Sequence, residues 1–386
     1  MSTRVAHIIT RFHGAGGAKN TLFTCKGLVA AGYEVDLVVG ASADAWRAEG
    51  SGVRWVQIPS LRRSIHPLHD ARATRDLLHL FRQRQYSIVH THLAKAGILG
   101  RWAARRAGTP ILIHSLHGAT FSPVQPALTH AFYLALEKIA APWTDRIVPV
   151  GEDLRQRYLA AGVGRPEQYE IIHSGMDLAA FLAAGQAKAA HRARIRSAFG
   201  LDENHFLAGY VAALEWRKGH HFLIEMLRDV APHHPHLRLL FAGEGFDRAR
   251  IEALTQAAGV SDRVIFSGYR TDIAEVMAAC DVKLFASERE GLPQVLVQAA
   301  AVGLPVLAFA AEGVAELVHE GCNGHIYRHG DIAALARGLE ALIAHPARRQ
   351  QMAAYGPGLV DERWTIQTMQ NKTLSLYLRL LEEKTR

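Results

Sequence analysis

A carboxylate, a glycine-containing turn and a proline precede an apolar stretch of helical composition late in the chain. Glu290 is followed by Gly291, Leu292 and Pro293, and Gln298 stands eight residues after Glu290. Proline suits a helix start because its missing N–H would be unpaired there, and the free N–H groups and dipole of the first turn attract an anion. Eight helical residues span about 12 Å, which approximates the reach from a sugar across a diphosphate to a ribose. The spacing predicts a site for a nucleotide-diphosphate sugar.

Two adjacent cations, Arg217 and Lys218, precede Gly219 at the predicted start of a helix over 219–230. Fixed cations at that point could neutralise a diphosphate leaving group, because negative charge builds on the departing phosphate as a glycosidic bond breaks. A solvated helix start is the alternative. Cations oppose the helix dipole at an N-terminus, however, so an anionic ligand explains them better.

A glycine-rich loop containing Gly14, Gly16 and Gly17 follows the first predicted strand and precedes a helix. Glycine lets the backbone approach a ligand closely, and the helix N-terminus favours a phosphate. A tight turn without a ligand is the open alternative. The dinucleotide-binding fingerprint would need a glycine where Lys19 stands and an acid where Gly40 stands, so the sequence disfavours a dehydrogenase.

Several histidines stand at predicted strand ends. His117 follows strand 111–114, at the edge where doubly wound sheets bind ligands, and could form a hydrogen bond with a substrate hydroxyl. A purely structural histidine is the alternative. His90 and His92 alternate beside Lys95 and could form a metal pair, but no carboxylate stands at ligand spacing, so we expect no metal site.

The elements that must position these residues alternate between short apolar runs and helical stretches, which predicts two α/β halves with parallel, doubly wound sheets meeting near residue 175. The predicted strands are 5–9, 35–39, 88–90, 111–114, 146–150, 170–173, 206–212, 238–242, 264–267, 282–286 and 305–309. The predicted helices include 18–31, 70–83, 219–230, 248–258, 272–279, 294–302 and 364–384, and 183–190 reads as a hinge or short helix. Ligands are expected at the carboxyl ends of the strands, in a cleft between the halves.

Size and composition agree with this organisation. A chain of 386 residues exceeds one ordinary core, and 49% apolar with 21% charged residues indicates a globular protein. We find no signal segment or transmembrane run, and three widely spaced cysteines fit reduced thiols. These features predict a cytoplasmic protein.

The positive charge is concentrated in the first half. Residues 1–180 hold 21 Lys+Arg and 13 Asp+Glu, a net of +8, whereas the remainder holds 23 of each. Such a field attracts phospholipid, phosphorylated glycan or nucleic acid, although a solvated surface without a partner is the alternative. The densest cluster lies in or beside helix 70–83, which could be interfacial or could pack its apolar stripe on the sheet; it comprises Arg62, Arg63, Arg72, Arg75, Arg82 and Arg84. No interleaved aromatics accompany it, so we expect no nucleic-acid partner.

Together these motifs resemble the family-4 retaining glycosyltransferases of the GT-B fold, over nearly the whole chain. The segments that carry the similarity are 14–17, 90–101, 117–118, 172–177, 218–219 and 290–298. The resemblance implies an α/β protein with two Rossmann-like doubly wound domains facing across a cleft. It implies an acceptor-binding domain over 1–175, a nucleotide-sugar domain over 176–363, and a C-terminal helix over 364–386 that crosses back to the first domain.

The resemblance also implies roles for individual residues. Glu290 would bind a donor-sugar hydroxyl, His117 would contact the sugar, and Lys218 with Arg217 would hold the diphosphate. Further donor contacts would come from Gly14, Gly16, Gly17, Ser267, Gly268, Tyr269, Arg270, Gly291, Leu292, Pro293 and Gln298, with Gln298 on the ribose and 267–270 beside the base. The acceptor or membrane side would include His92 and Lys95 of the matched segment 90–101, together with Arg62 and Arg63 of the basic cluster. No protein nucleophile, cofactor or metal ion is implied, because the leaving phosphate itself can deprotonate the acceptor.

Three positions depart from the family pattern. Gln298 replaces the family's ribose-binding glutamate, and a carboxamide accepts a hydroxyl hydrogen bond without charge assistance. Ala213 replaces an arginine, a loss for which Arg217 could compensate, and Ser174 replaces an asparagine. These changes bear on nucleotide affinity and leave the expected fold intact.

The sequence therefore predicts a metal-independent, retaining glycosyltransferase that moves a sugar from a UDP-sugar, or secondarily a GDP-sugar, to a bacterial envelope glycan or glycolipid. The expected location is the cytoplasm, with peripheral attachment to the anionic inner face of the cytoplasmic membrane. A sugar-nucleotide epimerase or small-sugar synthase of the same fold is one alternative. A catalytically weakened sugar-nucleotide-binding subunit is another.

Overall fold

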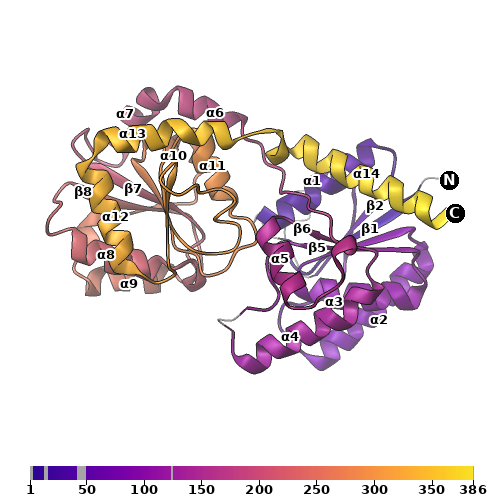
Figure 1. Cartoon of the computed structure of the whole chain (residues 1–386). Helices are drawn as coiled ribbons and strands as arrows, with labels where there is room; N and C mark the ends of the chain where they lie inside the picture. Colours follow the sequence, from indigo (N-terminus) through magenta and orange to yellow (C-terminus); the bar gives the residue numbers. More distant parts are fainter. Residues whose placement is uncertain (1–2, 13–15, 41–48, 123–124, 386) are drawn as a thin grey trace. The chain divides into compact units, whose positions relative to one another are not determined.

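The computed structural model describes residues 3–12, 16–40, 49–122 and 125–385 (Figure 1). The chain divides into two compact units. The first unit comprises Met1–Met176 together with Glu362–Arg386, and the second comprises Asp177–Asp361. Each unit has its own parallel sheet and its own hydrophobic core.

The first unit is built on a six-stranded parallel sheet in the order β3-β2-β1-β4-β5-β6. Its strands are β1 (Arg4–Ile9), β2 (Glu34–Val39), β3 (Arg54–Gln57), β4 (Ile88–His92), β5 (Ile111–Leu116) and β6 (Arg146–Pro149). The central strands are apolar runs buried on both faces, as expected for a parallel sheet covered by helices.

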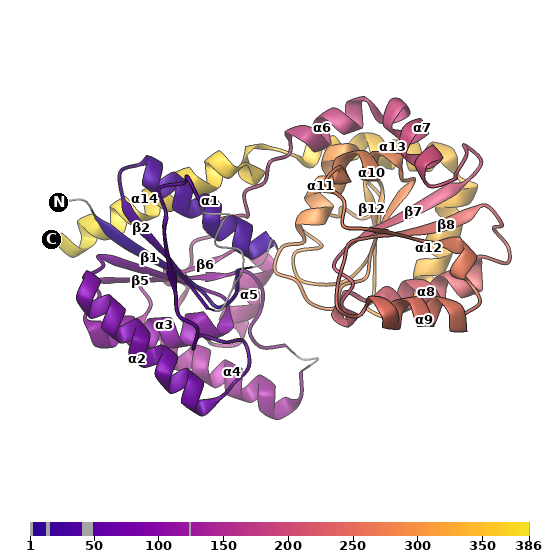
Figure 2. The same cartoon turned by 180° about the vertical axis from the view of Figure 1, so that it is seen from behind.

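Helices cover both faces of this sheet. They are α1 (Gly16–Ala30), α2 (Pro67–Arg84), α3 (Ala94–Ala107), α4 (Ala127–Ala140), α5 (Glu152–Ala160) and α14 (Ile366–Thr385). One face packs against α1 and α14, which lie side by side in both views, and the other packs against α2 and α3 (Figures 1 and 2). Helix α2 buries Ala73, Leu77 and Phe81 against the sheet, so its apolar stripe belongs to the core. Among the described residues, no helix is both long and apolar enough to cross a membrane.

The C-terminal helix α14 is integrated into the first unit. Its Gln370 donates a hydrogen bond of 2.7 Å to the carbonyl of Phe23 on α1, and a Cβ at Gly27 would lie 2.6 Å from the Gln370 side chain. The backbone N–H of Met176 donates to the carbonyl of Trp364 just before the helix. The last helix therefore belongs to the same core as the first strand.

The second unit repeats the architecture, with a parallel sheet in the order β12-β11-β10-β7-β8-β9. Its strands are β7 (Phe206–Val211), β8 (Leu237–Ala242), β9 (Val264–Gly268), β10 (Val282–Phe285), β11 (Val306–Phe309) and β12 (Gly324–Tyr327). Its helices are α6 (Ala179–Gln186), α7 (Lys188–Ala198), α8 (His220–Val230), α9 (Arg248–Ala257), α10 (Ile273–Ala279), α11 (Gln294–Val302), α12 (Ile332–Ala344) and α13 (Pro346–Tyr355). Two doubly wound parallel sheets are what the β–α alternation predicts, so this part of the prediction is confirmed.

One predicted strand is not formed, and the structure contains two edge strands that no apolar run predicts. Strand 170–173 was expected but is absent as a strand: the segment is extended and bonds to β6 through single backbone contacts. The segment 183–190, predicted as a hinge or short helix, is helical and spans the end of α6 and the start of α7. The edge strands β3 and β12 were not anticipated, because short, partly exposed edge strands lack a continuous apolar run.

The packing of α14 yields a stability prediction. Leu376 is fully buried in the core, so Leu376→Ala should cost about 2–5 kcal/mol through lost burial and a residual cavity. Leu378 is 49% exposed on the same helix, so Leu378→Ala should change the free energy of unfolding by no more than about 0.5 kcal/mol. Urea denaturation of both variants measures the difference. Equal losses would contradict the docking of α14 into this core.

Candidate active site

The strand order creates one switch point in each sheet. In the second unit β8 flanks β7 on one side and β10 flanks it on the other, so the loops after β7 and β10 leave the carboxyl edge in opposite directions. In the first unit β2 and β4 flank β1 in the same way. Doubly wound sheets bind ligands outside the carboxyl ends of strands at such points.

The loop after β7 is pressed against the end of β10. A 3-10 turn over Trp216–Lys218 ends at Gly219, whose φ of 74° is left-handed. A Cβ at Gly219 would lie 2.1 Å from the carbonyl oxygen of Ala286, so any other residue would have to push the two loops apart. The N–H of Glu288 donates to the carbonyl of Arg217 at 3.0 Å and joins the loops further. Glycine at position 219 thus fixes where the preceding lysine sits.

Lys218 and Glu290 form an ion pair across the switch point. The Lys218 Nζ lies 2.5 Å from Glu290 Oε1, and the two side chains are only 16% and 19% exposed. The hydroxyl of Tyr210 donates to the carbonyl of Lys218 and anchors the lysine backbone from β7. The structure therefore brings the two predicted donor-binding charges into direct contact, although they are 72 residues apart in the sequence.

Arg217 pairs with a different carboxylate from the one that Lys218 contacts. Its Nε donates to Glu215 Oε2 at 2.7 Å, within the same loop, and the arginine side chain is 39% exposed. The guanidinium is therefore held at the surface by a local carboxylate. The two adjacent predicted cations occupy different surroundings, and Lys218 is the one paired with the loop after β10.

The loop from β10 to α11 presents backbone at the same place. Gly291, Leu292 and Pro293 are buried, and a Cβ at Gly313 would lie 2.7 Å from the Gly291 carbonyl oxygen. Helix α11 begins at Gln294, with Pro293 in a non-helical conformation just before it. The prediction that Pro293 forms part of the first helical turn is therefore off by one position. The helix start has no side-chain cap and no acidic residue in its first turn, which leaves N–H groups and positive dipole available.

The remaining predicted donor residues occupy two places in the second unit. Gln298 lies in the second turn of α11 and is partly exposed. Ser267 and Gly268 end β9, which is two strands away from β7, and Tyr269 beyond them is 73% exposed. Arg270 donates a hydrogen bond to Asp272 at 2.8 Å in the same loop.

One loop at this edge was missed from the sequence. The turn after β8 lies between the β7 and β9 loops, and a Cβ at Gly245 would lie 2.2 Å from the Leu214 carbonyl oxygen. Asp247 accepts a hydrogen bond of 2.7 Å from the N–H of Trp216 and so supports the lysine-bearing turn. The sequence feature that could have predicted this loop is the pair Gly243 and Gly245, which follows an apolar strand.

In the first unit, helix α1 begins at Gly16, and Gly17 lies against His117. A Cβ at Gly17 would be 3.3 Å from the His117 ring, so glycine permits this approach. The His117 Nε2 is 3.0 Å from the Nδ1 of His92. Gly14, the third predicted glycine, lies outside the described residues.

The structure places the residues assigned to the acceptor side in different surroundings. Arg62 and Arg63 are exposed, and His92 is buried in the core at 2% exposure. The Lys95 Nζ lies 2.5 Å from Asp70 Oδ1 and also donates to the carbonyl of Ser64. A surface pocket of about 700 Å³ adjoins the two arginines; it is lined by Thr10, Arg11, Leu61, Arg62, Arg63, Ser64, Ile65 and Tyr133.

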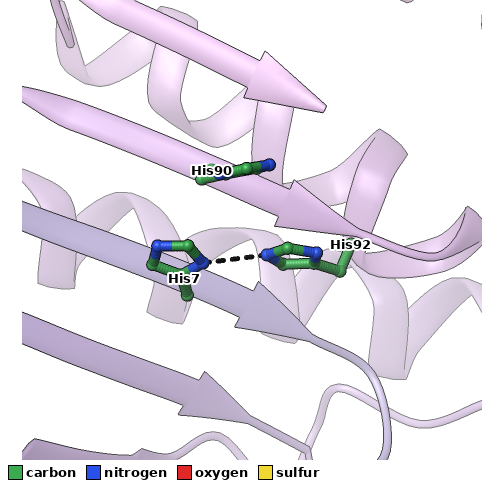
Figure 3. Close-up of side chains that lie close together, drawn as sticks. All are labelled: His7, His90 and His92. Carbon is green, nitrogen blue, oxygen red and sulfur yellow. Dashed lines mark hydrogen bonds between the residues drawn. The ribbon is translucent and has the colours of Figure 1, made fainter. Parts of the chain in front are cut away.

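Three buried imidazoles form the group in the described residues most suited to a metal ion. His7 on β1 joins His90 and His92 on β4, and ligand nitrogens of the three lie within 4.8 Å of one another (Figure 3). Nitrogen ligands of this kind suit zinc and other transition metals. In this structure their ring nitrogens hydrogen-bond to one another, to His117 or to hydroxyl groups.

Comparison with known families gives two matches that together span most of the chain. Residues 191–358 match the family described as glycosyl transferases group 1. Residues 15–175 match the glycosyl transferase 4-like domain. The two matched segments correspond to the second and the first unit.

Curated relatives and solved structures agree with these matches. The chain is 31% identical over 301 residues to EpsD of Bacillus subtilis (strain 168), a protein named as a glycosyltransferase, and the alignment covers 77% of each chain. It is 27% identical to an Escherichia coli protein named UDP-Gal:alpha-D-GlcNAc-diphosphoundecaprenol alpha-1,3-galactosyltransferase, over 78% of this chain and 77% of that one. The fold is similar to that of Anabaena HepE in complex with UDP and glucose, with a TM-score of 0.82, 20% identity, and coverage of 98% of this chain and 100% of that one.

The buried histidines make stability depend on pH. Burial lowers the pKa of His7 to about 3 and that of His117 to about 4, whereas histidines in an unfolded chain titrate near 6.5. The unfolded state therefore binds more protons between these values, so stability is present above about pH 6.5 and is lost as the pH falls toward about 4. Urea midpoints measured between about pH 7.5 and about pH 4.5 should fall accordingly.

A variant separates this effect from the titration of carboxylates. His7→Gln carries one fewer buried imidazole, so it should lose less stability between the two pH values than the natural protein, whatever its stability at neutral pH. An identical loss in both proteins would show that His7 does not contribute.

Proposed function

Because this chain belongs to the glycosyl transferases group 1 family, we propose that it transfers a sugar from a UDP-sugar to a lipid-linked bacterial glycan. The observation that carries the proposal is the Lys218–Glu290 pair, held at the switch point of the second unit by Gly219 and Tyr210. A cation and a carboxylate at that position suit the two parts of a sugar nucleotide, its diphosphate and its sugar hydroxyls. The name of the Escherichia coli relative supports UDP as the carrier and a diphosphoundecaprenol-linked sugar as the acceptor.

The donor would be held mainly by the second unit. Lys218 and Arg217 would bind the diphosphate, Glu290 would accept a hydrogen bond from a sugar hydroxyl, and Gln298 would bind the ribose. The free N–H groups at the start of α11 would add positive potential. The remaining proposed contacts are the backbone of Gly291, Leu292 and Pro293, the loop Ser267, Gly268, Tyr269 and Arg270, and the amides of Gly16 and Gly17.

Binding of the sugar nucleotide would rearrange the Lys218–Glu290 ion pair. Phosphate oxygens that approach Lys218 compete with Glu290 for the ammonium group, which frees the carboxylate to accept from a sugar hydroxyl. As the glycosidic bond breaks, charge builds on the departing phosphate, and the nearby cation stabilises this transition state more than the ground state. We propose that the leaving phosphate takes the proton of the acceptor hydroxyl, that the sugar is transferred with retention, and that no metal ion is required.

The first unit would meet the acceptor at an anionic membrane surface. Exposed arginines at Arg62 and Arg63 adjoin Ile65 and Leu68, which are 56% and 77% exposed. Basic side chains beside exposed apolar ones suit an interface that attracts anionic headgroups and accepts apolar side chains. We propose peripheral attachment to the inner face of the cytoplasmic membrane through this basic-apolar surface, comprising Arg62, Arg63, Ile65 and Leu68.

Donor binding and catalysis are tested together by single substitutions. UDP at about a hundred times its dissociation constant should stabilise the natural protein by about 2.7 kcal/mol in the absence of metal. Lys218→Ala should abolish this shift, and Glu290→Gln should reduce sugar transfer by about 10²–10³-fold. Calorimetric melting and a transfer assay with UDP-sugars, both with chelator present, provide the measurements.

The matched control is Lys372→Ala, which removes an exposed lysine on α14. This variant should keep both the UDP shift and the transfer rate. Unchanged transfer in both Lys218→Ala and Glu290→Gln would refute the proposed site. A UDP shift without turnover on any lipid-linked acceptor would favour a sugar-nucleotide-binding subunit instead.

Membrane attachment is tested by charge reversal. Arg62→Glu combined with Arg63→Glu should lower co-sedimentation with vesicles of anionic phospholipid by about tenfold or more, since each basic residue near such a surface contributes about 1 kcal/mol. Lys26→Glu with Lys372→Glu makes the same change in net charge on α1 and α14 and should bind nearly as the natural protein does. Equal losses in the two variants would indicate attraction by net charge alone.

A further inference from the structure

A continuous series of hydrogen bonds runs through the core of the first unit. At one end the Ser115 Oγ lies 2.7 Å from His90 Nε2, and His90 Nδ1 lies 2.7 Å from the hydroxyl of Tyr377. The same hydroxyl lies 3.1 Å from His7 Nε2. All four side chains are buried, and they come from β5, β4, α14 and β1.

The series continues to the carboxyl edge of the sheet. His7 Nδ1 lies 2.9 Å from His92 Nε2, the contact drawn in Figure 3, and His92 Nδ1 lies 3.0 Å from His117 Nε2. His117 is partly exposed, and its Nδ1 has no hydrogen-bond partner among the described residues. We call this series the imidazole relay: Ser115, His90, Tyr377, His7, His92 and His117.

Each imidazole of the relay is neutral at physiological pH. Burial lowers the pKa of His7 to about 3 and that of His117 to about 4, and it lowers those of His90 and His92 well below the ordinary value. Burial also raises the pKa of the Tyr377 hydroxyl. A neutral imidazole carries one N–H and one lone pair, so each histidine can donate on one side only.

Because each group of the relay is neutral, all of its hydrogen bonds must be donated in the same direction along the series. In one direction Ser115 donates to His90, His90 to Tyr377, Tyr377 to His7, His7 to His92 and His92 to His117. Every histidine then has its proton on Nδ1. In the opposite direction every histidine has its proton on Nε2. Any mixture leaves a buried link with two donors or two acceptors, or leaves the Tyr377 hydroxyl hydrogen without an acceptor, which burial makes costly.

Ser115 selects between the two directions. If His90 donated to Ser115, the serine hydroxyl hydrogen would need another acceptor, and the described residues supply none. Ser115 is 6% exposed, so water is not a ready substitute. If Ser115 donates to His90, the hydrogen is satisfied, and the direction in which every histidine is protonated on Nδ1 follows.

We propose that the imidazole relay locks His117 as a hydrogen-bond donor through Nδ1, and that Ser115, His90, Tyr377, His7 and His92 are positioning residues for it. The inference rests on the proposed function in one respect, the contact of His117 with the sugar. A fixed N–H recognises an oxygen that can accept, such as a sugar hydroxyl or a phosphate oxygen. The chemical identity of the group that His117 binds is therefore decided at Ser115 and Tyr377, which are remote from it along the relay.

The same imidazoles offer a competing interpretation as a metal site. Their nitrogens lie close enough to share an ion, but each ring nitrogen of His7, His90 and His92 already faces a partner. No aspartate or glutamate belongs to this group of ligands to offset a buried divalent charge. The relay accounts for all six nitrogens without an added ion.

The experiment is a multiple-bond nitrogen–proton NMR spectrum of the full chain, labelled with ¹⁵N-histidine and held at neutral pH with chelator. Single His→Gln variants assign the rings. We expect His7, His90, His92 and His117 all as the Nδ1–H tautomer, which is the less populated form of a free imidazole. An Nε2–H tautomer at any of the four would overturn the proposal. So would a stoichiometric zinc complex at these rings when zinc replaces the chelator.

Variants test whether the relay determines the tautomer of His117. Tyr377→Phe removes the link between His90 and His7, so His117 should change from one tautomer to a mixture of both. Tyr33→Phe is the matched control, because the Tyr33 ring packs edge-on at 6.3 Å from that of Tyr377 but its hydroxyl is not part of the relay. If Tyr377→Phe does not fold, Ser115→Ala removes the determinant at the far end. An unchanged His117 tautomer in whichever of these relay variants folds would refute the relay.

The transfer assay separates this inference from the proposed function. Loss of a fixed donor should raise the KM for the sugar donor by about two- to tenfold, the contribution of one hydrogen bond, with a smaller change in kcat. A changed tautomer with unchanged kinetics would support the relay and contradict the sugar contact of His117. Changed kinetics with an unchanged tautomer would overturn the relay and leave the proposed function in place.

Discussion

The close approach of the β7 and β10 loops is the constraint on which the candidate site depends. Parallel strands that are neighbours in a sheet need not be neighbours in sequence, and β7 and β10 are separated by two complete β–α units. Gly219 lets the two loops touch through backbone atoms alone, with the Ala286 carbonyl where a Cβ would stand. Lys218 and Glu290 are carried on these loops, so the backbone contact sets the distance between their charges.

The surroundings of this pair determine what it can do. Both side chains are largely shielded from water, which strengthens their attraction and also that of any phosphate that replaces Glu290. Arg217 is more exposed and already paired with Glu215, so its interaction with an anion is screened more strongly. Lys218 therefore attracts an anion more strongly than Arg217 does.

The first unit buries a series of polar side chains in its core. Its core contains the imidazole relay in place of a uniformly apolar face, and the hydrogen bonds of the relay compensate for burying it. Tyr377 is the member contributed by α14, so the helix that closes the core also completes the relay. The stability of the core and the tautomer of His117 are thus coupled, because both depend on the Tyr377 hydroxyl. The partly exposed end at His117 lies beside Gly17, at the switch point of this sheet.

The sequence by itself determined the two doubly wound sheets, because apolar strand runs and helical periodicity are local signals. It also predicted Lys218 and Glu290 as site residues, since a glycine after a lysine and a Gly-Leu-Pro turn after a glutamate are local patterns. It missed the edge strands β3 and β12, whose pairing depends on their neighbours more than on their composition. Only the tertiary structure decided that Lys218 contacts Glu290 and that His7 and Tyr377 join His90 and His92. Those contacts depend on strand register and helix docking between distant segments, which no local pattern encodes.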